Sequence, residues 1–485
     1  INARREAAVA RLNKEEAQRS ADKYRVAKDQ SDANAKKAEN NEALARGAQA
    51  KAQIQESISL ADQSLRQSAS GDIEGAMRRA IGALPADSTN LDRPFVAKAD
   101  YALAKAFLAN RLEATISPSS DWVNKVAYNS DGSRFAVGTR DGFLKIYDAA
   151  TNRELTSSNA RRQAVMTLAY STDGSRLVAA YQDPPSLAVL DGASGKLIRT
   201  FRLSALPNAV LLSHDGSKAV VVSQQNEMRP AVVDLNDESG NIHFLESHPK
   251  LGGGFLSLPR ATAMSPDDRF LLYVENNAVF VWDVASGALT ATSFEAGSNI
   301  RRIAVSESDE SFDAAAFRGD GAAVLIGKHR IYVADVRTGA IKDSFSFADD
   351  WQFATSRGPL LTPDGGKVVF AVNKRTLSTY SLTDWHLIAK RDLPADISEV
   401  AISPDGDVVA AAGADLTVRA WRIDSADPIG IFAGHKDRVH GMAFSPDGTH
   451  MISYGDATAR LWNLRPSQAM LDMLPPGLKA RSTNP

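Results

Sequence analysis

From about residue 111 onward, short apolar segments alternate with tight turns built on an Asp-Gly pair. Residues 441–454, GMAFSPDGTHMISY, show one such unit, in which two apolar runs flank the turn. Asp and Gly accept the backbone angles of a tight hairpin turn, and each flanking run has the length of a strand. A third apolar run follows the hairpin, here ARLWN at 459–463. The pattern predicts a repeating antiparallel β unit.

This turn recurs at a nearly constant interval. The turn aspartates are Asp131, Asp173, Asp215, Asp267, Asp320, Asp364, Asp405 and Asp447. Their successive spacings, obtained by subtraction, are 42, 42, 52, 53, 44, 41 and 42 residues. A period of about 40 to 45 residues with four short strands per unit is typical of a β-propeller blade. We therefore predict a mainly β fold, an eight-bladed β-propeller that follows an α-helical N-terminal region.

A seven-bladed propeller is the alternative, because the two long spacings indicate insertions around the fourth and fifth units. There, IRRIAVSESDE at 300–310 competes with FDAAAFRGDG at 312–321 as the innermost strand of a blade.

The last unit ends at its third strand, so its outer strand has to come from elsewhere in the chain. Residues 111–116 lie one strand ahead of the first unit. Pairing of this segment with the last blade would remove the open sheet edges, which favour aggregation. We predict that the propeller spans 111–465 and is closed by 111–116, with a C-terminal tail at 466–485.

The region before residue 111 has a different composition, rich in Ala, Glu, Gln, Lys and Arg. Strong helix formers predict a long helix over residues 1–53. Its larger apolar residues hold no heptad register, which leaves two interpretations, a solvated connector or an oligomerising coil.

Residues 54–110 are expected to form a small helical adaptor of three short amphipathic helices, the first burying Ile54, Ile58, Ala61 and Leu65. The segment GDIEGAMRRAIGAL at 71–84 resembles part of a tetratricopeptide repeat.

The last unit, GHKDRVHGMAFSPDG followed by YGDATARLWN, resembles a blade of the WD-repeat family. The resemblance covers residues 111–465 and implies a hydrogen-bonded set that fixes each blade. In the last blade this set maps onto His435, Ser453, Asp456 and Trp462, although the spacing to Ser453 is one residue short. Blade seven keeps Asp415 and Trp421, and blade one keeps Asp141 with Tyr in place of the Trp.

Composition narrows the classes of partner. The formal net charge is −2, so no basic field indicates nucleic acid. With no Cys the chain has no disulfide and no thiolate metal site. It has neither an apolar run of about 18 residues nor a secretory signal pattern, so we expect a cytoplasmic protein whose segment here does not insert into a membrane. The chain starts at Ile1, which suggests a piece of a longer polypeptide.

Motifs that carry chemistry are largely missing. His435 and His440 have no third ligand at metal spacing, and there is no G-x-S-x-G elbow, H-E-x-x-H helix or P-loop. We expect no enzyme activity, no metal and no cofactor. A quinone-type propeller enzyme is the alternative, because DGASGKLIRTF at 191–201 faintly resembles the docking repeat of quinone-dependent dehydrogenases, with Phe in place of its Trp.

The loops that lead into the innermost strands are the expected binding face, since propeller function lies in its loops. Trp and Arg often dominate interface energies. The candidate residues are Trp122, Asn124, Arg140, Arg260, Arg357, Arg438 and His440.

The order of helix, adaptor and propeller resembles the C-terminal half of bacterial multidomain proteins with a caspase-like, TIR or STAND-type module upstream. This resemblance implies a sensor that binds a protein, peptide or other ligand and regulates an effector fused upstream. A constitutive assembly scaffold is the alternative.

Overall fold

The structure is a computed structural model of the 485-residue chain. It describes residues 2–70, 73–85, 93–109, 111–158, 163–223, 229–237, 240–246, 261–275, 278–292, 301–302, 312–327, 330–346, 360–372, 374–426 and 428–465. The predicted tail, 466–485, lies outside these residues. The chain divides into two compact units, a helical one that ends at Phe107 and a β unit that begins at Leu108.

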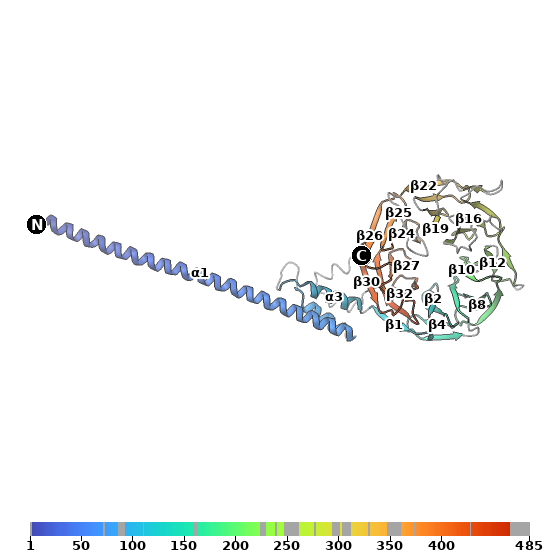
Figure 1. Cartoon of the computed structure of the whole chain (residues 1–485), viewed down its shortest axis with the longest axis horizontal. Coiled ribbons are helices and arrows are strands. Elements are labelled where there is room, and N and C mark those ends of the chain that lie inside the picture. The colour runs from blue at the N-terminus through green and yellow to red at the C-terminus, as the bar shows by residue number, and fades with distance from the viewer. Residues whose placement is uncertain are drawn as a thin grey trace. The chain divides into compact units, whose positions relative to one another are not determined.

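The helical unit contains α1 (Asn2–Ser70), α2 (Ile73–Gly82) and all but the last two residues of α3 (Ala97–Ala109). Figure 1 shows α1 as one long, continuous helix. The predicted change from connector to a separate short helix at residue 54 is therefore wrong. Strong helix formers continue across this position without a Pro, so nothing in the local sequence ends the helix there.

The C-terminal part of α1 packs through small side chains. Ser57, Ala61 and Ser64 are fully buried, whereas Ile54, expected on the buried face, is 38% exposed. The Ser64 hydroxyl donates a hydrogen bond to the Ala76 carbonyl of α2 at 2.7 Å. Small residues let helix axes approach closely, so the buried stripe of α1 follows Ser and Ala instead of the larger Ile.

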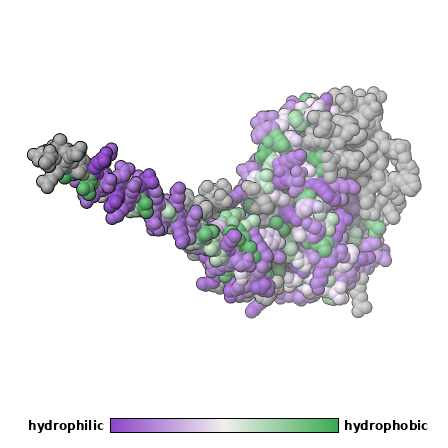
Figure 2. Space-filling model, turned by 60° about the vertical axis from the view of Figure 1, so that its left-hand side comes forward, coloured by the Kyte–Doolittle hydropathy of each residue, from purple (hydrophilic) through white to green (hydrophobic). Residues whose placement is uncertain are grey.

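Residues 9–49 of α1 are exposed on every side. Figure 2 shows this stretch as mostly hydrophilic, with isolated apolar positions. The larger apolar side chains there are 57–75% exposed: Val9, Leu12, Tyr24, Val26 and Leu44. Self-association through this helix stays a prediction, as does the choice between connector and coil. No helix in the described part of the chain is long and apolar enough to span a membrane.

The β unit contains eight sheets, each one blade. Blade one consists of β2 (Val123–Tyr128), β3 (Arg134–Thr139), β4 (Leu144–Asp148) and β5 (Glu154–Ser158), and blade two of β6 (Val165–Tyr170), β7 (Arg176–Tyr181), β8 (Ser186–Asp191) and β9 (Leu197–Arg202). Blade three consists of β10 (Pro207–Leu212), β11 (Lys218–Ser223), β12 (Ala231–Asp234) and β13 (Ile242–Phe244). Blade four consists of β14 (Ala261–Met264), β15 (Phe270–Glu275), β16 (Ala278–Asp283), β17 (Leu289–Thr292) and β18 (Arg301–Arg302). Blade five consists of β19 (Phe312–Phe317), β20 (Ala323–Gly327), β21 (Arg330–Ala334) and β22 (Ile341–Ser346), and blade six of β23 (Leu360–Leu361), β24 (Lys367–Val372), β25 (Thr376–Ser381) and β26 (Leu387–Asp392). Blade seven consists of β27 (Ile397–Ile402), β28 (Val408–Gly413), β29 (Thr417–Arg422) and β30 (Pro428–Ala433). Blade eight consists of β31 (Gly441–Phe444), β32 (His450–Tyr454) and β33 (Ala459–Asn463), together with β1 (Leu112–Ile116).

The eight-bladed prediction is confirmed, and the seven-bladed alternative is wrong. Figure 1 shows the blades arranged around a ring, with the first strand of a blade toward the centre and the last toward the rim. The segment at 312–317 is β19, the innermost strand of blade five, whereas Arg301–Arg302 forms β18 and pairs in parallel with β17 of blade four. The long spacings therefore reflect insertions between blades.

The propeller core lies between neighbouring blades. One cluster joins Phe270 and Val281 of blade four to Leu325 and Tyr332 of blade five. Burying a large apolar side chain stabilises the fold by roughly 1.5–3 kcal/mol. Adjacent sheets thus stabilise each other, and no blade has a complete core by itself.

The repeated turns are fixed by a small polar arrangement at their tips. In blade two, the Ser171 hydroxyl donates to the Asp173 carboxylate at 2.6 Å and accepts the Arg176 N–H at 3.0 Å. The hydrogen bond from Ser171, followed by those from Ser175, lowers the pKa of Asp173 to about 2. The turn sequence repeats because each of these side chains satisfies the backbone of the hairpin.

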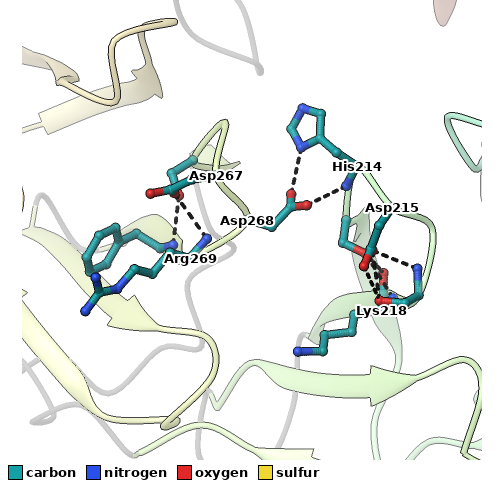
Figure 3. A network of polar contacts seen from close by, with 10 residues as sticks. His214, Asp215, Lys218, Asp267, Asp268 and Arg269 are labelled. Atoms are coloured by element: carbon teal, nitrogen blue, oxygen red, sulfur yellow. Dashed lines mark hydrogen bonds and ion pairs between the residues drawn. The ribbon is translucent and has the colours of Figure 1, made fainter.

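Turns of adjacent blades also contact each other. Gly216 has a φ of +65°, and a Cβ there would lie 2.8 Å from Cβ of Ser171 in the preceding blade. Blade four has Asp268 at the equivalent position, with a φ of 56°. Its carboxylate accepts the backbone N–H of His214 at 2.8 Å and lies 2.7 Å from Nδ1 of the same residue, as Figure 3 shows. A polar bridge here takes the place of the close Gly contact.

The ring is closed by a strand from the front of the β unit. β1 pairs antiparallel with β33, with Thr115 opposite Arg460 and Ile116 opposite Ala459. Arg111, just before β1, is only 3% exposed and donates from Nη1 to the Leu464 carbonyl at 3.1 Å. Burial lowers the pKa of Arg111 to about 10. Blade eight thereby gains its fourth strand and a buried cation that holds the two chain segments together.

Replacing Arg111 with Ala should lower the free energy of unfolding by roughly 1–3 kcal/mol, because a buried carbonyl loses its donor. The measurement is the urea midpoint followed by Trp fluorescence. Arg153→Ala, at an exposed hairpin position, is the matched control and should change stability by less than about 0.5 kcal/mol. Equal midpoints for the two variants would contradict the role given to Arg111.

Candidate functional site

Blade eight contains a buried chain of polar side chains. The Trp462 indole N–H donates to the Ser453 hydroxyl at 2.8 Å, and the same hydroxyl lies 2.7 Å from Nε2 of His435. Nδ1 of His435 lies 3.4 Å from the Asp456 carboxylate. The structure thus brings together the four residues that the family resemblance implies, including Ser453, whose position in the sequence is one residue short.

The charges of this set follow from its burial. Burial, followed by the positive charge of Arg460, lowers the pKa of His435, and the nearby Asp456 only partly opposes this. Burial by itself would raise the pKa of Asp456, but hydrogen bonds from the Lys436 N–H and from Thr458 hold it at about 2. Around neutral pH the set therefore consists of a neutral imidazole beside a carboxylate, which suits a structural role.

Other blades have only parts of this set. In blade seven, Asp415 accepts hydrogen bonds from Thr417 at 2.8 Å and from Arg419 at 2.8 Å. Trp421 of the same blade is 3% exposed and belongs to an apolar cluster. In blade one, Asp141 accepts from the Thr139 hydroxyl at 2.5 Å. These aspartates fix local turns, and rigidity in their blades depends more on apolar packing.

Sequence reasoning missed a buried arginine between blades six and seven. Arg391 of β26 is 3% exposed and donates to the carbonyls of Ser425 at 2.8 Å and Ile423 at 2.7 Å, and to the Thr379 hydroxyl at 2.8 Å. Burial lowers its pKa to about 10. Its inward position in the strand alternation was the only available signal, because its carbonyl acceptors lie on the neighbouring blade.

Candidate binding residues gather where blades eight and one meet. Trp122, just before β2, is 39% exposed, and its ring centroid lies 5.2 Å from that of His440. The Arg140 guanidinium lies 5.7 Å from the centroid of the same indole. Arg438 is exposed and its charge acts on His440. We call Arg140, Trp122, His440 and Arg438 the Trp122 cluster.

Asn124 does not join this cluster. The Asn124 side-chain amide donates to the Val165 carbonyl at 3.1 Å, which ties blade one to blade two. Arg260 and Arg357 lie outside the described residues. Among the residues that the structure describes, no group of three or more His, Asp or Glu side chains could hold a metal ion.

The acidic residues next to the cluster are already engaged. Asp121 accepts the backbone N–H of Trp122 at 2.7 Å, and Asp437 accepts that of Arg438 at 2.7 Å. These bonds fix the loops just before the innermost strands of both blades. The cluster is therefore held on ordered loops.

Three segments of the chain match the WD domain, G-beta repeat (WD40) family model: residues 110–148, 390–422 and 426–463. The propeller contains WD40 repeats. Two of these segments carry the blades that meet at the Trp122 cluster.

The chain matches only part of the length of its curated relatives. WD repeat-containing protein 1 of Gallus gallus is 23% identical over 389 residues, which are 73% of this chain and 63% of that protein. Serine-threonine kinase receptor-associated protein of Bos taurus is 28% identical over 98 residues, 20% of this chain and 28% of that protein. The chain thus spans less than two thirds of the length of these curated relatives.

A solved structure shares the fold. The crystal structure of the C-terminal WD40 domain of Sif2 superposes with a TM-score of 0.55 at 16% sequence identity, covering 73% of this chain and 99% of that one. At this identity the likeness concerns the fold alone.

Ser453→Ala should lower the free energy of unfolding by roughly 2–4 kcal/mol, because the variant leaves both the Trp462 N–H and the His435 ring nitrogen without a buried partner. Thermal and urea unfolding measure the loss. Ser157→Ala, on the exposed side of β5, should leave stability unchanged. If the two variants lose equal stability, the polar set is not structural.

The imidazole of His440 should titrate below the ordinary value of 6.5, because burial, followed by the Arg438 charge, lowers its pKa. Arg438→Gln should raise the pKa of His440, and Asp437→Asn should lower it further, since Asp437 raises it. An NMR titration of the His440 ring protons reads both shifts. An unchanged pKa in Arg438→Gln would show that the two side chains do not face each other.

Proposed function

We propose that this propeller is a non-enzymatic recognition module that binds a protein partner through the face carrying the Trp122 cluster. The observation that carries the proposal is the exposed Trp122 ring, which lies against both the Arg140 guanidinium and the His440 ring where two blades adjoin. Large, rigid side chains of this kind lose little conformational entropy on binding and often dominate interface energies.

The fold suits such a role. Loops on a closed ring of sheets are positioned by a rigid core, so a partner meets a preformed surface. The carboxylates and backbone groups next to the cluster are hydrogen-bonded to each other. Binding therefore requires little rearrangement on this side of the interface.

Protein is a better fit than nucleic acid. The net charge of the chain is −2, and nucleic-acid affinity depends on neutralising many phosphates. The Bos taurus relative is named as a protein that associates with a receptor, which agrees with a binding role for such repeats. A cytoplasmic location stays a prediction.

We further propose that binding regulates an effector module encoded upstream of Ile1. Support comes from the order of elements, in which α1, α2 and α3 precede the propeller, and from the resemblance to bacterial proteins with caspase-like, TIR or STAND-type modules. A constitutive scaffold is the alternative, in which the propeller holds a partner without controlling any activity.

Trp122→Ala combined with Arg438→Ala should weaken partner binding by at least about 30-fold, as expected for a loss of 2 kcal/mol or more at a dominant contact. The partner is first captured by crosslinking to the propeller and identified, and its affinity is then measured by calorimetry. Arg153→Ala is the control and should bind as the parent does. Unchanged affinity in the double variant would place the binding face elsewhere.

The regulatory part is tested on the full-length protein with and without residues 111–465. A sensor predicts that basal effector activity remains while its response to the partner is lost. If the response persists without the propeller, or if no activity depends on partner binding, regulation by this module is wrong.

A further inference from the structure

We propose that the Trp122 cluster recognises a carboxylate on a peptide segment of the partner, an Asp or Glu flanked by an apolar side chain that packs on the Trp122 ring. This inference rests on the proposed binding function and adds the chemistry of the ligand.

The two guanidinium groups of the cluster are hydrogen-bond donors without a carboxylate partner in the described part of the chain. Among the described residues, no carboxylate lies within ion-pair distance of the Arg140 or Arg438 guanidinium. The nearest acidic side chains in sequence have other partners: Asp121 and Asp437 accept backbone N–H groups, and Asp141 accepts the Thr139 hydroxyl. A guanidinium presents a planar fork of donors that matches a carboxylate.

Another arginine on the same face pairs with a carboxylate of the propeller itself. Arg375, in the loop between the second and third strands of blade six, pairs at 2.8 Å with Asp396, which immediately precedes β27. Arg140 occupies the corresponding loop of blade one, and the residue immediately before β6 is Ala164. The residue that precedes the next innermost strand therefore supplies a carboxylate to Arg375 but offers none to Arg140.

The indole supplies the apolar half of the site. Trp122 remains 39% exposed although Arg140 and His440 both lie against it. A guanidinium stacked on an aromatic ring keeps its donors at the ring edge, where a ligand can reach them. A carboxylate next to an aliphatic or aromatic side chain satisfies both halves together.

The charge of the residues around the cluster favours a ligand with a single carboxylate over a polyanion. Two arginines of the cluster stand beside Asp121, Asp141 and Asp437, so the neighbourhood has no excess of positive charge. A ligand with many phosphates gains little at such a site, because its affinity depends on neutralising many charges, whereas one carboxylate needs only the short-range donors of a guanidinium group. This favours an acidic peptide over nucleic acid.

The test selects short random peptides displayed on phage against the intact chain. Selected sequences should be enriched in Asp or Glu next to an apolar residue. Synthetic peptides from the selection should quench Trp122 fluorescence and shift the His440 ring protons, and their Glu→Gln or Asp→Asn versions should bind at least about tenfold more weakly.

Variants of the protein locate the contact. Arg140→Gln with Arg438→Gln should abolish the preference for the acidic peptide over its amide version. Arg153→Gln should keep the preference, and unchanged melting temperatures would show that all variants fold. A single-stranded RNA oligonucleotide should not compete.

Three results would overturn the inference: no acidic enrichment, an acidic preference that survives in the double variant, or stronger competition by RNA than by peptide. These results are distinct from failure of the proposed function. If a natural partner requires Trp122 for binding but does not require Arg140 and Arg438, the proposed binding face is supported and only the carboxylate ligand is wrong.

Discussion

The pairing of β1 with β33 is the interaction on which the rest of the propeller depends. Seven blades are built from consecutive strands, whereas the eighth takes its outer strand from the segment ahead of blade one. Neighbouring blades share their apolar core, so an unclosed ring would expose an apolar face and two sheet edges at once. Closure also creates the Trp122 cluster, because Trp122 belongs to blade one and His440 to blade eight. The candidate binding surface therefore exists only in the closed ring.

The polar set inside blade eight and the Trp122 cluster, which lies between blades eight and one, differ in burial. The chain from Trp462 through Ser453 to His435 is buried, and its Ser453 hydroxyl joins the Trp462 N–H to the His435 ring within the blade itself. In the Trp122 cluster the side chains are exposed and the arginine donors point to no described carboxylate. Buried hydrogen bonds of this kind help to specify a fold, whereas exposed donors beside an aromatic ring are suited to an external acceptor.

The number of blades could be predicted from the sequence, because each hairpin turn is stabilised by its own side chains and its motif therefore recurs. The closing segment could be predicted because the last unit has only three strands of its own. The length of α1 did not follow, since Ile54 and Ile58 suggested a new amphipathic face, whereas Ser57 and Ser64 lie buried beside the expected Ala61. Contacts between blades were equally hidden. Arg391 binds carbonyls of the next blade, and Asn124 proved to join two blades although its position suggested binding. Sequence spacing encodes the turns, but contacts between blades depend on how the sheets stack.

Amide hydrogen exchange in residues 112–116 tests the central claim most directly. If β1 closes the ring, its amides should be protected to the same degree as those of β33, because both would exchange only when blade eight opens. Exchange of this segment at the rate of an unstructured peptide, while β33 remains protected, would contradict the closed ring and with it the surface formed where blades eight and one meet.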